Sequence, residues 1–105
     1  MAWLLLIGAG VVEIAMALAL KAAEGWSKPL PGLFGIAAAL VSIFLLTLAM
    51  KELPTGTAYA VWTGIGAIGV AVLGIIVYSD SPSFARLVCI ALIMMGTIGL
   101  RLIEN

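Results

Sequence analysis

Four apolar segments, each long enough to cross a membrane as a helix, occupy most of this chain. A transmembrane helix needs about 20 apolar residues to span a hydrocarbon core of about 30 Å. The connections between the segments are too short to hold a soluble domain, so the function must reside within the segments. We therefore expect an all-α integral membrane protein that forms a single domain over residues 1–105, with spans at about 2–20, 32–50, 55–78 and 84–103.

The composition agrees with lipid as the solvent of this chain. Hydrophobic residues make up 65% of the 105 residues, charged residues 10%, and the formal net charge is zero. A soluble domain of this size cannot bury so much apolar surface. The chain has no basic tract, which excludes the electrostatic signature of a nucleic-acid-binding protein. It has no histidine, and we interpret its single cysteine, Cys89, as a buried thiol in an apolar segment.

The positively charged residues give almost no bias in membrane orientation. One side of the membrane would hold Lys51 and Arg101, and the other Lys21, Lys28 and Arg86. Orientation normally follows the excess of Lys and Arg on one side, so we expect this chain to insert both ways. Four short helices are too few to enclose a polar pathway. Two copies in opposite orientations, an antiparallel dimer, would recreate the inverted repeat of larger transporters.

Glu13 is the charged residue that lies in the middle of an apolar segment. An ionised side chain at that depth costs about 3 kcal/mol on membrane-insertion scales. No intramembrane Lys or Arg is available to neutralise it, so we interpret Glu13 as a site for protons or a bound cation. The alternative is a structural glutamate that is hydrogen-bonded to a neighbouring helix. Apolar surroundings favour the neutral acid, and a second Glu13 from another subunit would make the two titrate as coupled sites.

Small and polar residues surround Glu13 in this prediction. Gly10 and Ala17 share its helical face and leave room for a cavity or a close helix contact. Ser42 lies near mid-depth in the second segment, where its hydroxyl could donate to Glu13 or simply bond its own backbone. Four residues of the third segment share one face by their spacing: Tyr59, Trp62, Thr63 and Gly66.

Trp62 lies about 10 Å inside the third segment, deeper than a residue of the interfacial belt. A buried indole needs a partner for its N–H group, and its ring face attracts cations. We therefore predict that this face lines a pocket. The alternative is ordinary packing, with Tyr59 at the membrane interface.

Glycines mark the third and fourth segments. Gly64, Gly66 and Gly69 match G-x-G-x-x-G, but no strand precedes them, so they do not indicate a dinucleotide site. They favour a close helix approach or a kink that bends during transport. Gly96 and Gly99 lie one turn apart in the fourth segment, which we interpret as a dimer contact. The short connection at residues 51–54 predicts that the second and third segments pack as an antiparallel hairpin.

Together these residues resemble the small multidrug resistance transporters. Glu13 lies in the first of four segments, and the third opens with K-x-L-P-x-G-T-A-Y-A-V-W at residues 51–62. The resemblance covers essentially the whole chain, and the motif of the third segment is specific. The sequence WTGIGA at residues 62–67 looks like the guanidinium-exporter subtype, because polyaromatic-cation exporters usually carry a serine after that tryptophan.

The resemblance implies a proton-coupled antiporter that works as an antiparallel dimer in the inner membrane of a bacterium. Glu13 of both subunits would bind either protons or the cation, and the fourth segment would form the dimer contact. The substrate pocket would be lined by Gly10, Met16, Ser42, Tyr59, Trp62 and Thr63.

Met16 departs from the subtype, which usually carries a tryptophan three residues after the glutamate. Loss of that N–H donor could admit alkylated or hydrophobic cations. Export of guanidinium or small substituted guanidiniums is therefore the first hypothesis, and broad export of quaternary ammonium cations is the second. A third is a structural membrane subunit or one half of a paralogous pair. We expect no enzyme activity, cofactor or metal, because the sequence has no nucleophile–base pair and no set of metal ligands.

Overall fold

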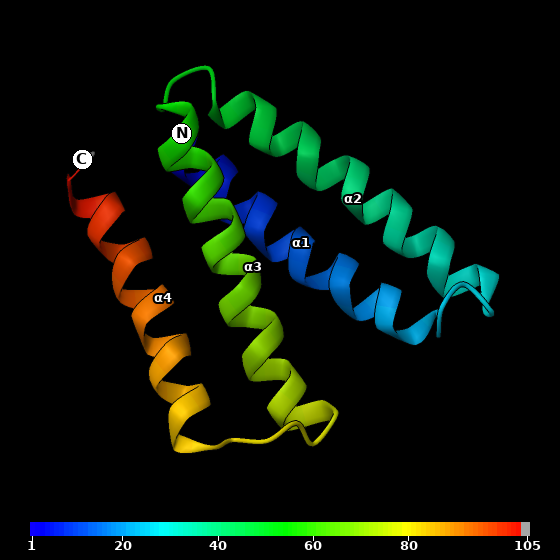
Figure 1. The fold of residues 1–105 in the computed structure, drawn as a ribbon. Coiled ribbons are helices and arrows are strands. Elements are labelled where there is room, and N and C mark those ends of the chain that lie inside the picture. The colour runs from blue at the N-terminus through cyan, green and yellow to red at the C-terminus, as the bar shows by residue number, and fades with distance from the viewer. Residues whose placement is uncertain (104–105) are drawn as a thin grey trace.

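The computed structural model describes residues 1–103 and folds them into four helices joined by short connections (Figure 1). All four are long and apolar enough to cross a membrane, which confirms the predicted all-α membrane architecture. The helices are α1 (Ala2–Ala22), α2 (Pro29–Ala49), α3 (Thr55–Val77) and α4 (Phe84–Ile103).

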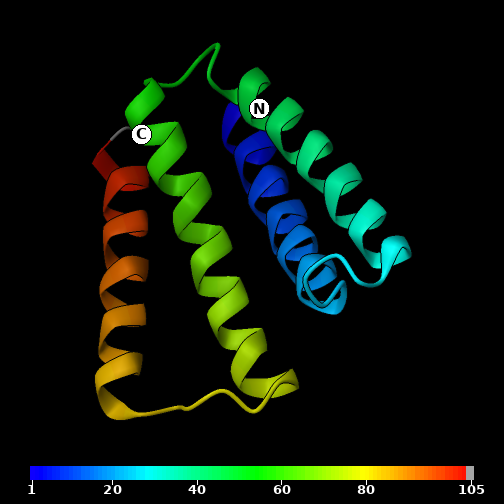
Figure 2. The same ribbon diagram turned by 45° about the vertical axis from the view of Figure 1, so that its right-hand side comes forward.

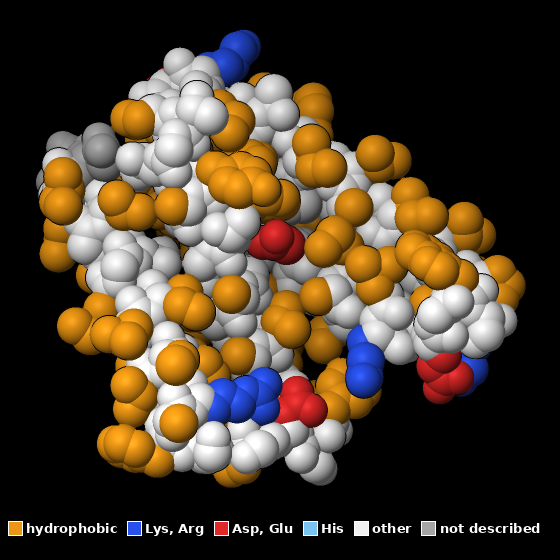
Figure 3. All heavy atoms as spheres, viewed as in Figure 1, with side chains coloured by type: hydrophobic (Ala, Val, Ile, Leu, Met, Phe, Trp, Pro, Cys, Tyr) orange, Lys and Arg blue, Asp and Glu red, His pale blue; other side chains and the backbone are white. Residues whose placement is uncertain are grey.

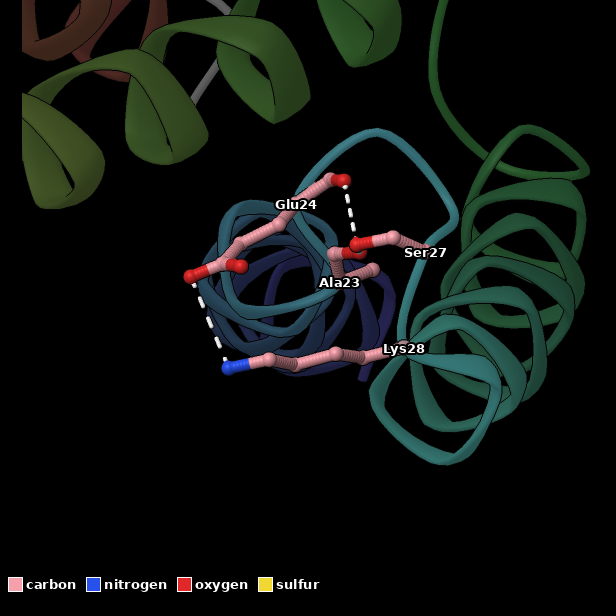
Figure 4. Close-up of polar contacts among 4 residues, drawn as sticks. All are labelled: Ala23, Glu24, Ser27 and Lys28. Atoms are coloured by element: carbon pink, nitrogen blue, oxygen red, sulfur yellow. Dashed lines mark hydrogen bonds and ion pairs between the residues drawn. The ribbon is translucent and has the colours of Figure 1, made fainter.

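The first connection is shorter than the sequence suggested, because α2 begins at Pro29 rather than at residue 32. Proline is favoured in the first turn of a helix, where its missing N–H group is not needed for a hydrogen bond. The backbone reverses with positive φ angles at Glu24, Gly25 and Trp26. Figure 4 shows how the turn is held: the Ser27 hydroxyl donates to the Glu24 carbonyl at 2.8 Å, and the Lys28 ammonium lies 3.5 Å from the Glu24 carboxylate.

The helices lie side by side in the order α2, α1, α3, α4, as the turned view in Figure 2 makes clear. The predicted hairpin of the second and third segments is therefore wrong: α2 packs along α1 and makes few contacts with α3. The tight turn forces α2 and α3 to run in opposite directions, but it does not force them to pack. The result is a flattened layer with principal extents of 41 × 34 × 16 Å, too thin to enclose a site by itself.

The small buried core lies where α1, α2 and α3 meet, near the chain's N-terminal end. Its members are Leu6, Ala9, Leu46, Ala49, Ala58 and Val61. By contrast, the backbone of α4 lies close to that of α3 but not to those of α1 and α2, and α4 has no buried residue within the described part of the chain. Cys89 on α4 is exposed, so the prediction of a buried thiol is wrong for the single chain.

Charged groups gather toward the ends of the helices. The N-terminus, the α2–α3 connection and the end of α4 lie at one end, and the other two connections lie at the opposite end (Figure 1). This arrangement matches the grouping used for the charge count. At the first end the Arg101 guanidinium lies 4.7 Å from the centre of the Trp3 ring, and at the second the Lys21 ammonium lies 5.6 Å from that of Tyr78. Figure 3 also shows an acidic side chain at mid-height among hydrophobic ones.

Candidate functional site

Glu13 projects from the middle of α1 toward α3, where Gly66 makes room for it. A Cβ atom at Gly66 would overlap Glu13 Oε1 and would lie 2.6 Å from its Cδ. Oε1 is buried and has no hydrogen-bond partner among residues 1–103. A buried polar atom without a partner is costly, typically about 1–3 kcal/mol and more for a charged group. A proton or a bound cation would supply the partner that this oxygen lacks.

The hydroxyl of Ser42 connects three helices beside the buried core. It donates to the Ala9 carbonyl of α1 at 2.6 Å and accepts from Trp62 Nε1 of α3 at 2.9 Å. A serine hydroxyl has a single proton, so it cannot donate to Glu13 at the same time. The expected Ser42–Glu13 hydrogen bond is replaced by one to Ala9, which lies one turn before Glu13 on α1.

Two aromatic side chains extend this cluster. The rings of Tyr59 and Trp62 lie 5.4 Å apart between centres, with a tilt of 54°. Tyr59 is about half exposed, and Trp62 is half-buried with its N–H group paired to Ser42. The indole therefore has the partner that a buried tryptophan needs. The surface of the two aromatic rings is the part of this cluster that is still accessible to a ligand.

Thr63 lies on another side of α3 than the sequence pattern suggested. Its hydroxyl lies 3.0 Å from the Tyr59 carbonyl oxygen and 3.1 Å from that of Ala60, so its single proton is donated to the backbone of its own helix. Together with Gly64 it lines a groove between α3 and α4 with a volume of about 610 Å³. The structure thus separates Thr63 from the cluster of Ser42 and Trp62.

The glycines of α3 lie at close contacts on two sides of the helix. A Cβ at Gly64 would overlap the Thr97 hydroxyl of α4, and one at Gly69 would overlap Ile14 Cδ1 of α1. These glycines let α1 and α4 approach α3 closely, as small residues do in membrane helices. A bend at the glycines during transport remains a prediction.

Gly10 and Met16 are the other predicted pocket residues of α1. A Cβ at Gly10 would lie 2.8 Å from Ile65 Cβ, so Gly10 is buried in a helix contact and does not border open space in the single chain. The sequence left open whether the small residue at this position borders a cavity or a close helix contact, and the structure shows the close contact. Met16 is half-buried.

Gly96 and Gly99 on α4 face open space within the described residues. A Cβ at either position would meet nothing within 4 Å. Nothing in residues 1–103 explains why these positions should be small, so their role as a dimer contact stays a prediction.

Sequence reasoning missed two contacts of the site. The Ala9 carbonyl accepts from Ser42, and Ile65 packs on Gly10. Ala9 and Ile65 are ordinary apolar residues, so their types carry no signal. The spacing of Ala9, four residues before Glu13, was the available indication.

Comparison with known proteins identifies the family. The model of the family described as "Small Multidrug Resistance protein" matches residues 1–93. Proteins named "Guanidinium exporter" are similar over 102 residues, or 97% of this chain. The protein from Yersinia pseudotuberculosis serotype I is 50% identical, with 98% of its own length covered. Those from Proteus vulgaris and Salmonella typhimurium are 48% and 49% identical, with 98% and 97% of their lengths covered. The chain therefore belongs to the small multidrug resistance family of membrane transporters.

Proposed function

We propose that this protein exports guanidinium or small substituted guanidinium cations in exchange for protons. The observation that carries the proposal is the Glu13 carboxyl group, whose Oε1 is buried without a hydrogen-bond partner. The names of the relatives, which match nearly the whole chain, supply the substrate class. A guanidinium ion has N–H donors on every edge and can meet carboxylates in bidentate fashion.

Competition for Glu13 provides the coupling between substrate and protons. A protonated carboxyl group has lost the charge that holds a cation, and a bound cation stabilises the ionised form. Protons and substrate therefore displace each other at the same group. No further coupling machinery is needed, provided that the site opens to one side of the membrane at a time.

The flattened chain needs a partner to enclose such a site. The single layer of helices is 16 Å thick, and α4 is unburied along its described length. We infer an antiparallel homodimer in a bacterial inner membrane, with a Glu13 from each subunit near the midplane and α4 at the dimer contact. The near balance of Lys and Arg between the two ends supports insertion in both orientations. A paralogous partner would serve the same geometry.

Broad export of quaternary ammonium cations is the second candidate. The Trp62 N–H group is used by Ser42, so Trp62 offers its ring face rather than a donor, and Tyr59 adds a second aromatic ring beside it. Ring faces bind cations that have no N–H groups. Competition by tetrapropylammonium against guanidinium transport separates the two candidates, because a guanidinium-selective site admits it poorly.

Transport by the purified chain in liposomes tests the proposal. A pH gradient should drive guanidinium movement, and Glu13→Gln should abolish it. Transport by this chain alone also excludes a purely structural subunit and the need for a paralogous partner. Guanidinium movement that persists unchanged in Glu13→Gln contradicts the proposal.

A further inference from the structure

The contact between α1 and α3 continues from Glu13 to the membrane end that carries the α3–α4 connection. Residues at i+4 and i+8 from Glu13 and Gly66 lie along the same helix faces: Ala17 and Lys21 on α1, Val70 and Gly74 on α3. A cavity of about 120 Å³ lies between them, and its walls also include Tyr78 and Asp80. Lys21 is eight residues from Glu13, or about 12 Å along the helix. The cavity thus lies at the membrane end of the same helix contact that holds Glu13.

Asp80 is held in the wall of this cavity by the end of α3. Its N–H group donates to the Gly74 carbonyl at 3.1 Å. A Cβ at Gly74 would overlap Asp80 Oδ2, so the carboxylate lies directly on the glycine. The absence of a side chain at Gly74 is what lets an acidic group reach the mouth of the cavity.

The Asp80 carboxylate already holds a guanidinium group, which is the side chain of Arg86. Arg86 Nη2 lies 3.6 Å from Asp80 Oδ2, and Nη1 donates to the Ser81 carbonyl at 2.9 Å. Both side chains of the ion pair are partly exposed, at 46% for Asp80 and 35% for Arg86. Exposed ion pairs contribute only about 0–1 kcal/mol, so another cation of the same chemistry can replace Arg86.

We propose that Asp80 and the Ser81 carbonyl form an entry site for guanidinium-type cations, where the substrate replaces the Arg86 side chain before it moves toward Glu13. The inference rests on the proposed function and adds a second binding position to it. A free guanidinium ion carries the same planar set of N–H donors as Arg86. Lys21 lines the same cavity, and its charge limits the affinity of a cation there. Weak binding suits a site that the cation occupies briefly before it moves toward Glu13.

Opposite effects of two substitutions on transport test the entry site. Asp80→Asn removes the acceptor charge and should raise the KM for guanidinium, whereas Arg86→Gln removes the competitor and should lower it, with kcat unchanged in both. An exposed pair worth up to about 1 kcal/mol corresponds to a change of up to about fivefold in KM. A purely structural ion pair predicts that both substitutions change transport in the same direction, and that result would overturn the inference.

The Glu24–Lys28 pair supplies matched controls at the same end of the molecule. It is an exposed pair with a separation of 3.5 Å, and neither residue lines the 120 Å³ cavity. Glu24→Gln and Lys28→Gln change the charge as the test substitutions do, and both should leave the KM unchanged. KM shifts in these controls equal to those of Asp80→Asn and Arg86→Gln would show general electrostatics, which contradicts a specific site.

Binding in Glu13→Gln separates this inference from the proposed function. Guanidinium chloride titrated into the isotope-labelled, full-length Glu13→Gln variant should shift the amide signals of Asp80 and Ser81. Tetramethylammonium chloride, which has no N–H group, should not, and Asp80→Asn should abolish the guanidinium effect. Equal shifts with both salts, or none, overturn the entry site. If the unsubstituted protein fails to transport guanidinium, the proposed function falls, whatever the amide signals show.

Discussion

Gly66 on α3 provides the space that the Glu13 carboxyl group of α1 occupies. A Cβ at Gly66 would overlap Oε1, the buried oxygen that has no hydrogen-bond partner within residues 1–103. The two residues are 53 positions apart in the chain, yet a side chain at position 66 would collide with the Glu13 carboxyl group where it now lies. Gly66 therefore makes room for the Glu13 carboxyl group as well as for close packing of the helices.

Gly66→Ala should therefore reduce guanidinium transport at least tenfold while the protein still folds. The added methyl group forces the carboxyl group out of its position, and small displacements of a reacting group are costly. Gly56→Ala is the matched control, because a Cβ at Gly56 meets nothing within 4 Å. Initial rates in liposomes measure the effect. Equal rates for the two variants would show that Glu13 does not depend on this space.

Ser42→Ala should destabilise the fold by about 1–3 kcal/mol, because it leaves Trp62 Nε1 without its partner and removes the hydrogen bond that the Ala9 carbonyl accepts from outside its own helix. Thr47→Ala is the control, since the Thr47 hydroxyl bonds only the Ile43 carbonyl of its own helix. Thermal unfolding in detergent measures both. If the two variants unfold at the same temperature, the Ser42 cluster contributes nothing special to stability.

Gly64→Ala should loosen the contact between α3 and α4, because its Cβ would overlap the Thr97 hydroxyl. Thr97→Ala removes that oxygen, so the double variant should regain most of the lost stability. A double-mutant cycle of unfolding free energies measures the coupling, and contacting residues typically couple by about 0.5–3 kcal/mol. Strictly additive effects would contradict the contact.

Gly96→Ala should weaken the dimer and leave the fold of the single chain intact. A Cβ at Gly96 meets nothing within 4 Å in the described chain, so any clash must come from a partner subunit. The dimer fraction in lipid, measured by cross-linking across a dilution series, is the readout. An unchanged dimer fraction would remove Gly96 from the proposed interface.

Much of the fold could be predicted because lipid imposes simple rules. Four apolar segments of the right length must be helices, and the position of Glu13 alone makes it a candidate functional residue. The neighbours of each helix could not be predicted, because α1, α2 and α3 are apolar on nearly all sides and carry little directional pattern. The hairpin of α2 and α3 failed for this reason.

The site was predicted in its residue types more than in its contacts. Ser42 and Trp62 meet in the structure, but the hydroxyl bonds Ala9 rather than Glu13. Helical spacing predicted that Thr63 shares a face with Trp62. In the structure the two neighbouring residues point to different helices: Trp62 bonds Ser42 of α2, and Thr63 lines the groove beside α4. The path of α4 decides which side of α3 is covered, and nothing in the periodicity of α3 encodes that path.

Proton release on substrate binding tests whether guanidinium and protons exchange at the Glu13 carboxyl group. Guanidinium chloride is added to the purified protein in weakly buffered detergent solution at neutral pH, and the protons released are counted. Protons should be released into solution when the cation displaces them from Glu13, guanidinium binding should weaken as the pH falls, and Glu13→Gln should release no protons. Guanidinium binding without proton release, or equal release from Glu13→Gln, would contradict exchange at this carboxyl group.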